Sequence, residues 1–156
     1  MSVLYIVQGF LGAGKTTWST EFARKAKATR LNADEYCAAN FPQAQLDTDW
    51  DNCFAKAVST LWDDAGERLK RGEDVILDFG FWTKESRDHA RGKALDWKVE
   101  LQLYFVTAPD EVLIERIGRR GGEIARRNIA NFQHYKTFFE APSPAENAIV
   151  IDTSVK

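Results

Sequence analysis

The sequence predicts an α/β fold, in which a mainly parallel, five-stranded sheet carries helices on both faces. Short apolar runs of strand length alternate along the chain with longer segments of helical period. A glycine-rich loop joins the first apolar run to the first helical segment. Strands that alternate with helices are joined by crossovers, which place neighbouring strands parallel. The chain has 156 residues, 44% of them apolar, and is long and apolar enough to form one hydrophobic core. We therefore expect a single domain over residues 1–156.

Five segments have the composition of strands. They span residues 3–7, 29–32, 75–77, 99–106 and 148–151. The first is apolar without alternation, which is typical of a strand buried on both faces. The second leads into Asn32-Ala33-Asp34, and the third ends on Asp78, so polar groups follow both strands.

Helical segments fill the intervals between the strands. They are expected at residues 15–27, 49–70, 83–96, from 109 onward, and 128–139. In the longest of them, apolar residues recur in steps of three and four. Thr83 suits an N-cap, and Gly72 suits a helix end. Residues 40–48, which contain Pro42, are expected to form a loop.

The loop after the first strand fits the pattern G-x-x-x-x-G-K-[ST] at every fixed position. Its glycines let backbone N–H groups curl around phosphates, and the following helix adds the positive end of its dipole. Lys15 is expected to bridge the β- and γ-phosphates, and Thr16 to bind Mg²⁺ through its hydroxyl. We therefore predict ATP and Mg²⁺ as cofactors, with the nucleotide held by Gly9, Gly12, Ala13, Gly14, Lys15, Thr16 and Thr17.

The remaining motifs favour a kinase among the proteins that use such a loop. The guanine-specificity motif N-K-x-D is absent, and Asp78 is a single acid where a motor ATPase has a pair. A small kinase needs an acid beside the acceptor hydroxyl and an arginine-bearing lid that excludes water. Asp34 follows a strand at the sheet edge where ligands bind. Arginines crowd residues 116–128, which we interpret as the lid.

Together these segments resemble the small P-loop kinase group, which includes polynucleotide 5′-hydroxyl kinases, zeta-toxin-like kinases and AAA-like single-domain ATP-binding proteins. The resemblance covers nearly the whole chain. It lies in the loop, residues 32–35, residues 75–78 with Arg87 downstream, the lid arginines, and residues 139–142 before the last strand. It implies a three-layered P-loop NTPase fold.

The resemblance also implies roles for individual residues. Asp34 would deprotonate or orient the acceptor hydroxyl, and Asp78 would bind substrate or the water shell of the metal. Arg116 or Arg120 would stabilise the transferring phosphoryl group together with Lys15. Nucleic-acid kinases of the group often carry an arginine shortly after the first acid, whereas none follows closely here.

Several of these residues also have a simpler structural interpretation. Asp34 suits the N-cap of the helix that follows it, and Arg87 suits a solvated helix face. Trp82 lies just past a strand end, where it could stack on a substrate ring or pack against the next helix. We take Asp34, Asp78, Trp82 and Arg87 as the expected substrate site.

The sequence thus predicts an ATP- and Mg²⁺-dependent phosphotransferase that acts on a hydroxyl of a small molecule such as a nucleoside, a sugar or an antibiotic. A nucleic-acid 5′ end is the less favoured acceptor. Two alternatives remain open. One is an ATP-binding or ATP-hydrolysing switch that regulates a partner, and the other is a P-loop scaffold with weak turnover.

Composition limits the binding partners and the cellular compartment that we expect for the protein. A net charge of −2 gives no electrostatic reason to expect broad nucleic-acid or membrane binding. No apolar run approaches the ~20 residues of a membrane span. The N-terminus lacks the basic region and long apolar stretch of a signal peptide, so we expect a cytoplasmic protein. Cys37 and Cys53 lack metal-ligand spacing and are expected to be buried free thiols.

Overall fold

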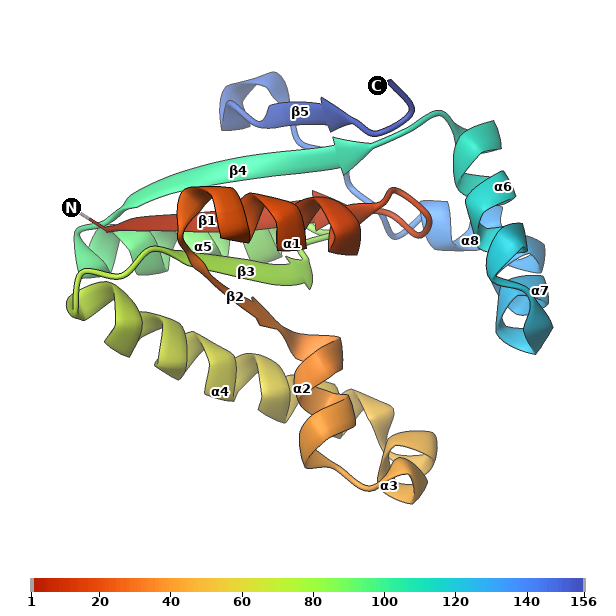
Figure 1. Cartoon of the computed structure of the whole chain (residues 1–156), viewed down its shortest axis with the longest axis horizontal. Coiled ribbons are helices and arrows are strands. Elements are labelled where there is room, and N and C mark those ends of the chain that lie inside the picture. Colours follow the sequence, from red (N-terminus) through yellow and green to blue (C-terminus); the bar gives the residue numbers. More distant parts are fainter. Residues whose placement is uncertain (1, 156) are drawn as a thin grey trace.

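A five-stranded parallel sheet forms the centre of the molecule (Figure 1). The structure is a computed structural model that describes residues 2–155. The strands are β1 (Val3–Gly9), β2 (Thr29–Asn32), β3 (Val75–Gly80), β4 (Glu100–Thr107) and β5 (Ile149–Asp152). Their order is β2-β3-β1-β4-β5, and all four neighbouring pairs are parallel. The predicted fold class is confirmed.

Helices cover both faces of this sheet and produce three layers. They are α1 (Lys15–Ala26), α2 (Ala33–Asn40), α3 (Gln43–Thr48), α4 (Trp50–Lys70), α5 (Lys84–Trp97), α6 (Asp110–Arg120), α7 (Gly122–Ala130), α8 (Phe132–Lys136) and the short 3-10 helix η1 (Pro144–Glu146). Because side chains alternate along β1, Leu4 and Ile6 join a buried cluster with α4 and α5. Val7 points to the other face and joins a cluster with α1, α6 and α7.

The carboxyl ends of the strands meet at one edge of the sheet, and two groups of helices lie there. The loop between β1 and α1 lies at this edge, with α2 and α3 on one side and α6, α7 and α8 on the other (Figure 1). Ligands of open α/β sheets bind at this edge. The arrangement therefore leaves a site at the loop that side chains of distant segments can reach.

Two segments differ from their predicted structure. Residues 43–48 form a helix and not a loop, with Pro42 as its N-cap residue at φ −62°. Leu46 is the only large apolar residue of this helix and packs on the core, so the segment shows little apolar period. The helix predicted at 128–139 is two helices, and the first already begins at Gly122. Gly121 and Gly122 have positive φ angles and separate α6 from α7.

Other local predictions hold. Thr83 is the N-cap of α5, and its hydroxyl accepts a hydrogen bond from the Ser86 amide at 3.1 Å. Cys37 and Cys53 are buried free thiols. In residues 2–155, no helix combines the length and the apolar character that crossing a membrane requires.

Candidate nucleotide and acceptor site

The loop that joins β1 to α1 is shaped by two glycines in left-handed conformations. Gly12 has φ +79° and Gly14 has φ +86°, which side chains rarely tolerate. A Cβ on Gly12 would lie 2.7 Å from the carbonyl oxygen of Leu113, so the loop can approach α6 only with glycine there. Gly14 is the N-cap residue of α1 and has no side chain to cap it. The first amides of α1 are therefore free to bind an anion.

A cavity of about 530 Å³ lies over this loop. Its walls combine the loop residues with side chains from four other segments. These side chains are Asp34, Trp50, Phe54, Phe79, Trp82 and Arg120. Among the residues predicted for the site, the structure thus brings Asp34, Trp82 and Arg120 to the same cavity as Lys15 and Thr16.

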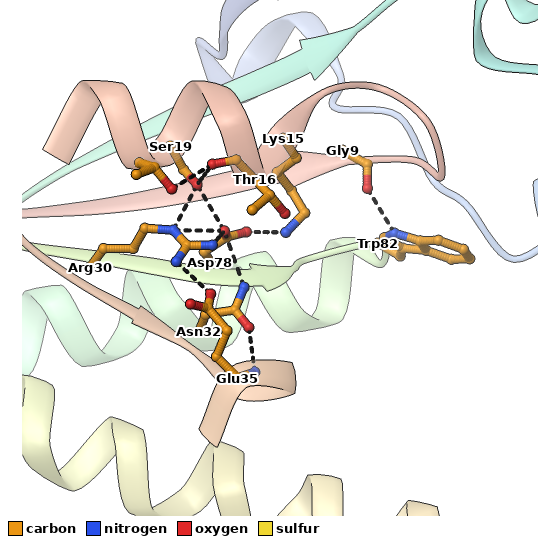
Figure 2. Close-up of polar contacts among 10 residues, drawn as sticks. Gly9, Lys15, Thr16, Ser19, Arg30, Asn32, Glu35, Asp78 and Trp82 are labelled. Atoms are coloured by element: carbon orange, nitrogen blue, oxygen red, sulfur yellow. Dashed lines mark hydrogen bonds and ion pairs between the residues drawn. The ribbon is translucent and has the colours of Figure 1, made fainter. Parts of the chain in front are cut away.

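Asp78 is the centre of a buried polar network behind the loop (Figure 2). Lys15 donates a short hydrogen bond to it and forms an ion pair with it. On its other oxygen, Ser19 donates at 2.8 Å, Arg30 at 2.7 Å and Asn32 at 3.2 Å. The network ties α1, β2 and β3 together directly beneath the phosphate loop.

Opposing effects act on the Asp78 carboxyl. Burial alone would raise its pKa, but the charge of Lys15, hydrogen bonds from Lys15 and Ser19, and the charge of Arg30 outweigh burial and lower the pKa. Asp78 is therefore an anion at neutral pH. It can balance Lys15 when no phosphate is present.

Three members of this network were not among the residues predicted from the sequence. Ser19 lies one helical turn after Lys15, so both project toward Asp78. Arg30 and Asn32 are two residues apart on β2, and Asn32 is in register with Asp78. Side chains two residues apart on a strand point to the same face of the sheet. This alternation is the sequence signal that could have placed Arg30 and Asn32 on the same face as Asp78.

Asp34 is free of the capping role that the sequence left open. Asn32 is the N-cap of α2, because its side chain accepts a hydrogen bond from the Glu35 amide at 2.8 Å. Asp34 instead opens into the cavity beside the loop. Burial raises the pKa of Asp34, Lys15 lowers it, and the negative charges of Asp78 and Glu35 raise it further, with a net upward shift. A carboxyl group with a raised pKa in a cavity is a candidate proton acceptor.

Trp82 supports the loop as well as the cavity wall. Its indole N–H donates to the carbonyl oxygen of Gly9 at 3.0 Å (Figure 2). Its ring stacks on Phe10 with centroids 5.0 Å apart. Gly80 and Phe81 precede it with φ angles of +91° and +46°, so two successive left-handed residues turn the chain back toward β1. Trp82 thus packs on the phosphate loop, a contact that neither interpretation named, and stacking on a substrate ring stays a prediction.

The two lid arginines that we singled out lie in different places. Arg116 donates to the carbonyl oxygens of Gly12 and Ala13, each at 3.3 Å, and to the hydroxyl of Thr153 at 2.7 Å. Its guanidinium thereby holds the outer side of the loop. Arg120, one turn later on α6, borders the cavity and faces the space above the loop.

Arg87 lies outside the walls of this cavity. Its side chain is 1% exposed and forms an ion pair with Glu146 at 2.8 Å. It also donates to the carbonyl oxygen of Phe81 at 2.9 Å. The structure therefore gives Arg87 a set of protein partners that neither the substrate interpretation nor the solvated-face interpretation foresaw.

Few side-chain oxygen atoms of the site are placed to bind Mg²⁺. Within residues 2–155, no group of three His, Cys, Asp or Glu side chains lies together as a metal cage. Mg²⁺ at phosphate sites keeps several waters and takes one or two protein oxygens in addition to the phosphates. Thr16 in the first turn of α1, with Asp78 behind it, offers that kind of donor set.

A central parallel strand, a phosphate loop of this sequence and the free N-terminus of the following helix together define a P-loop nucleotide-binding protein. The model of the family described as "AAA domain" matches residues 4–142. The chain belongs to this family, and the kinase-like P-loop class suggested by the sequence is confirmed. No curated protein matches the sequence.

Solved structures of other proteins share the fold. An unliganded sugar kinase from Janibacter sp. HTCC2649 superposes with a TM-score of 0.72 at 21% identity, over 100% of this chain and 88% of that one. A gluconokinase from Sinorhizobium meliloti 1021 superposes with a TM-score of 0.67 at 21% identity, over 99% of this chain and 83% of that one. Chaetomium thermophilum Kti12 in complex with ADP-AlF3 superposes with a TM-score of 0.67 at 18% identity, over 98% of this chain and 90% of that one. At these identities the similarities show a shared fold.

Proposed function

We propose that the protein transfers the γ-phosphoryl group of ATP, bound with Mg²⁺, to a hydroxyl group of a small molecule. One observation carries this proposal: the carboxylate of Asp34 opens into the same cavity as the phosphate loop. Within the described residues, no hydrogen-bond donor engages that carboxylate. An acid that is held beside the phosphates without a structural partner is suited to an acceptor hydroxyl.

Each part of the site has a role in this transfer. The loop amides and Lys15 hold the β- and γ-phosphates, and Thr16 holds the Mg²⁺, which neutralises phosphate charge when bound. Lys15 leaves Asp78 to reach the phosphates, and Arg30 stays beside Asp78 as its counter-charge. Arg120 supplies positive charge from the opposite wall of the cavity.

The reaction is an in-line displacement at the γ-phosphorus. The acceptor oxygen forms a new bond to phosphorus, and the bond from phosphorus to the β–γ bridging oxygen breaks and releases ADP. The proton of the acceptor hydroxyl passes to the carboxylate of Asp34. Catalysis of this kind depends mainly on positioning and on stabilisation of charge.

The substitution Asp34→Asn tests the proposal. It removes the proton acceptor and keeps the size of the side chain, so we expect transfer to fall by about 100-fold or more. ATP affinity should stay within about twofold, because the phosphate contacts are unchanged. Transfer is measured with labelled ATP and a panel of hydroxyl compounds, and ATP affinity by calorimetry.

Asp47→Asn is the matched control, since Asp47 is exposed on α3, and it should leave both quantities unchanged. Full transfer by Asp34→Asn would remove Asp34 from the mechanism. Steady release of free phosphate with every acceptor would instead favour the hydrolysing switch and overturn the kinase proposal.

A further inference from the structure

A second cavity, of about 880 Å³, lies between α4 and α5. Its floor is apolar and mainly aromatic, and is formed by Phe54, Val58, Trp62, Phe79, Phe81 and Trp82. The first three come from α4, Phe79 comes from the carboxyl end of β3, and Phe81 and Trp82 follow that strand. We call this cavity the aromatic groove. Its volume lies in the range of cavities that hold small organic ligands.

The aromatic groove adjoins the cavity over the phosphate loop. Phe54, Phe79 and Trp82 line both. A molecule whose body lies in the groove therefore has Asp34 and the phosphate loop in the neighbouring cavity. This adjacency connects the groove with phosphoryl transfer.

One stripe of α4 runs through both cavities. Trp50 and Phe54 line the loop cavity, and Phe54, Val58 and Trp62 line the aromatic groove. These four residues recur every fourth position, so they share one face of the helix. Twelve residues of helix cover about 18 Å. The stripe thus gives an apolar track that leads away from the phosphates.

Polar side chains also line the groove, namely those of Ser59, Thr83, Ser86 and His89. Asp63, Glu85 and Lys93 are its charged lining residues, with a net charge of −1 from two acids and one base. A nucleic-acid backbone requires positive charge along its path. The groove lacks that positive charge, and its aromatic floor suits an apolar body.

We propose that the aromatic groove is the acceptor site and selects a small hydroxyl-bearing molecule with an aromatic or alkyl body. The body packs between the α4 stripe and the aromatic residues at and just after the carboxyl end of β3. The hydroxyl extends past Phe79 and Trp82 to Asp34. This inference rests on the proposed phosphotransfer and names the class of its acceptor.

The first test compares acceptors that differ in their apolar body. Labelled ATP is offered with 3-phenylpropan-1-ol, glycerol, gluconate or an oligonucleotide with a 5′-hydroxyl. We expect a kcat/KM for the aromatic alcohol that is at least about tenfold higher than for the other three, because only its ring gains from burial in the groove. Transfer with equal or higher kcat/KM to a polar acceptor overturns the groove inference and leaves the proposed function standing.

The second test changes the groove floor and leaves the phosphate loop intact. Val58→Asp places a charge in the middle of the apolar floor and should raise the KM for the aromatic alcohol at least about tenfold. The KM for ATP should stay within about twofold. Thr60→Asp, on the same helix but outside the groove lining, is the control and should leave both values unchanged.

Ala55→Trp is a second variant that tests the same inference if Val58→Asp fails to fold. Ala55 is an exposed residue that lines the groove, so an indole there fills the groove with little change to the core. It should also raise the KM for the aromatic alcohol. An unchanged KM in a folded variant of either kind overturns the inference. Free phosphate as the sole product with all acceptors overturns the proposed function, and the acceptor role of the groove with it.

Discussion

Two carboxylates of the site, Asp34 and Asp78, have opposite electrostatic surroundings. Asp78 is buried among Lys15 and Arg30, which hold its pKa below the ordinary value. Asp34 is an exposed residue of the cavity wall, and within residues 2–155 it has no hydrogen-bonding partner for its carboxylate. Partial desolvation raises its pKa, and the charges of Asp78 and Glu35 add to this against the opposing effect of Lys15. Environments that push the pKa values of two acids apart give them different tasks. Asp78 is suited to remain an anion, and Asp34 is suited to gain and lose a proton.

The raised pKa of Asp34 predicts an acid limb in the pH dependence of transfer. Only the ionised carboxylate can accept the hydroxyl proton, so kcat/KM for the acceptor should fall as the pH drops through the pKa of Asp34. The midpoint should lie above 3.8, the ordinary aspartate value. It is measured as the pH profile of kcat/KM at saturating ATP. A midpoint at or below 3.8, or the same limb in Asp34→Asn, would contradict the assignment.

Lys15 is predicted to serve nucleotide binding more than folding. In Lys15→Ala, Asp78 keeps Arg30, Ser19 and Asn32 as partners, so the unfolding temperature should change little. ATP affinity should fall at least about tenfold, because a charge-assisted contact to the phosphates is lost. Calorimetry and thermal unfolding measure the two effects. Lys25→Ala, exposed on α1, should leave ATP affinity unchanged, and equal affinities of the two variants would refute this role.

At the scale of elements, the phosphate loop is fixed from several sides. Gly12 packs against the backbone of α6, and Arg116 holds the loop carbonyl oxygens from the same helix. On its inner side, Trp82 holds Gly9. The loop is therefore preorganised by contacts that lie far away in the sequence, and its glycines are not interchangeable.

Gly12→Ala should disrupt the loop more than an alanine at another left-handed glycine. Gly72 has φ +87° with open space around its Cβ position, so Gly72→Ala should cost about 1 kcal/mol of backbone strain. Gly12→Ala adds a clash with Leu113 and should cost at least about 2 kcal/mol. Denaturant unfolding measures both, and only Gly12→Ala should weaken ATP binding. Equal costs would show that the loop can move away from α6.

Strands and the phosphate loop could be predicted because their signals are local. The apolar run of β1 and the glycine pattern after it are continuous in the sequence. The helix at residues 43–48 lacked such a signal, because Leu46 is its only large apolar residue. The partners of Arg87 and Arg116 were also out of reach, since Glu146 and Thr153 lie 59 and 37 residues away. Long-range ion pairs and hydrogen bonds leave no period in a sequence.

For the whole molecule, the C-terminal segment is anchored by one buried acid. Glu146 in η1 binds Arg87 and Arg91 of α5, at 2.8 and 2.6 Å. It also accepts a hydrogen bond from the Ser143 amide at 2.7 Å. The hydrogen bond from Arg87 is the largest effect on the pKa of Glu146, and together these contacts lower it to about 2 against the opposing effect of burial. The segment before β5 is thereby fixed to the helix that borders the aromatic groove.

Glu146→Gln should lower stability in a manner that depends on pH. Because the folded pKa lies below the ordinary 4.5, the stabilisation is full above about pH 5 and is lost as the pH falls toward 2. At pH 7 the variant should lose about 2 kcal/mol, or about 4–8 °C in Tm. The difference from the unmodified protein should shrink from pH 5 to pH 3 in thermal unfolding. Glu67→Gln, in an exposed pair, should show neither effect, and a difference that does not vary with pH would contradict this account.

Trp82 borders the loop cavity and the aromatic groove at once and is hydrogen-bonded to Gly9. A shift of the loop on phosphate binding would therefore also shift a wall of the groove. Thermodynamic linkage makes such an effect reciprocal: if ATP strengthens groove binding by some factor, a groove ligand strengthens ATP binding by the same factor. The substitution Trp82→Phe removes the hydrogen-bond donor to Gly9. Any cooperativity between the two sites that depends on this bond would then be lost.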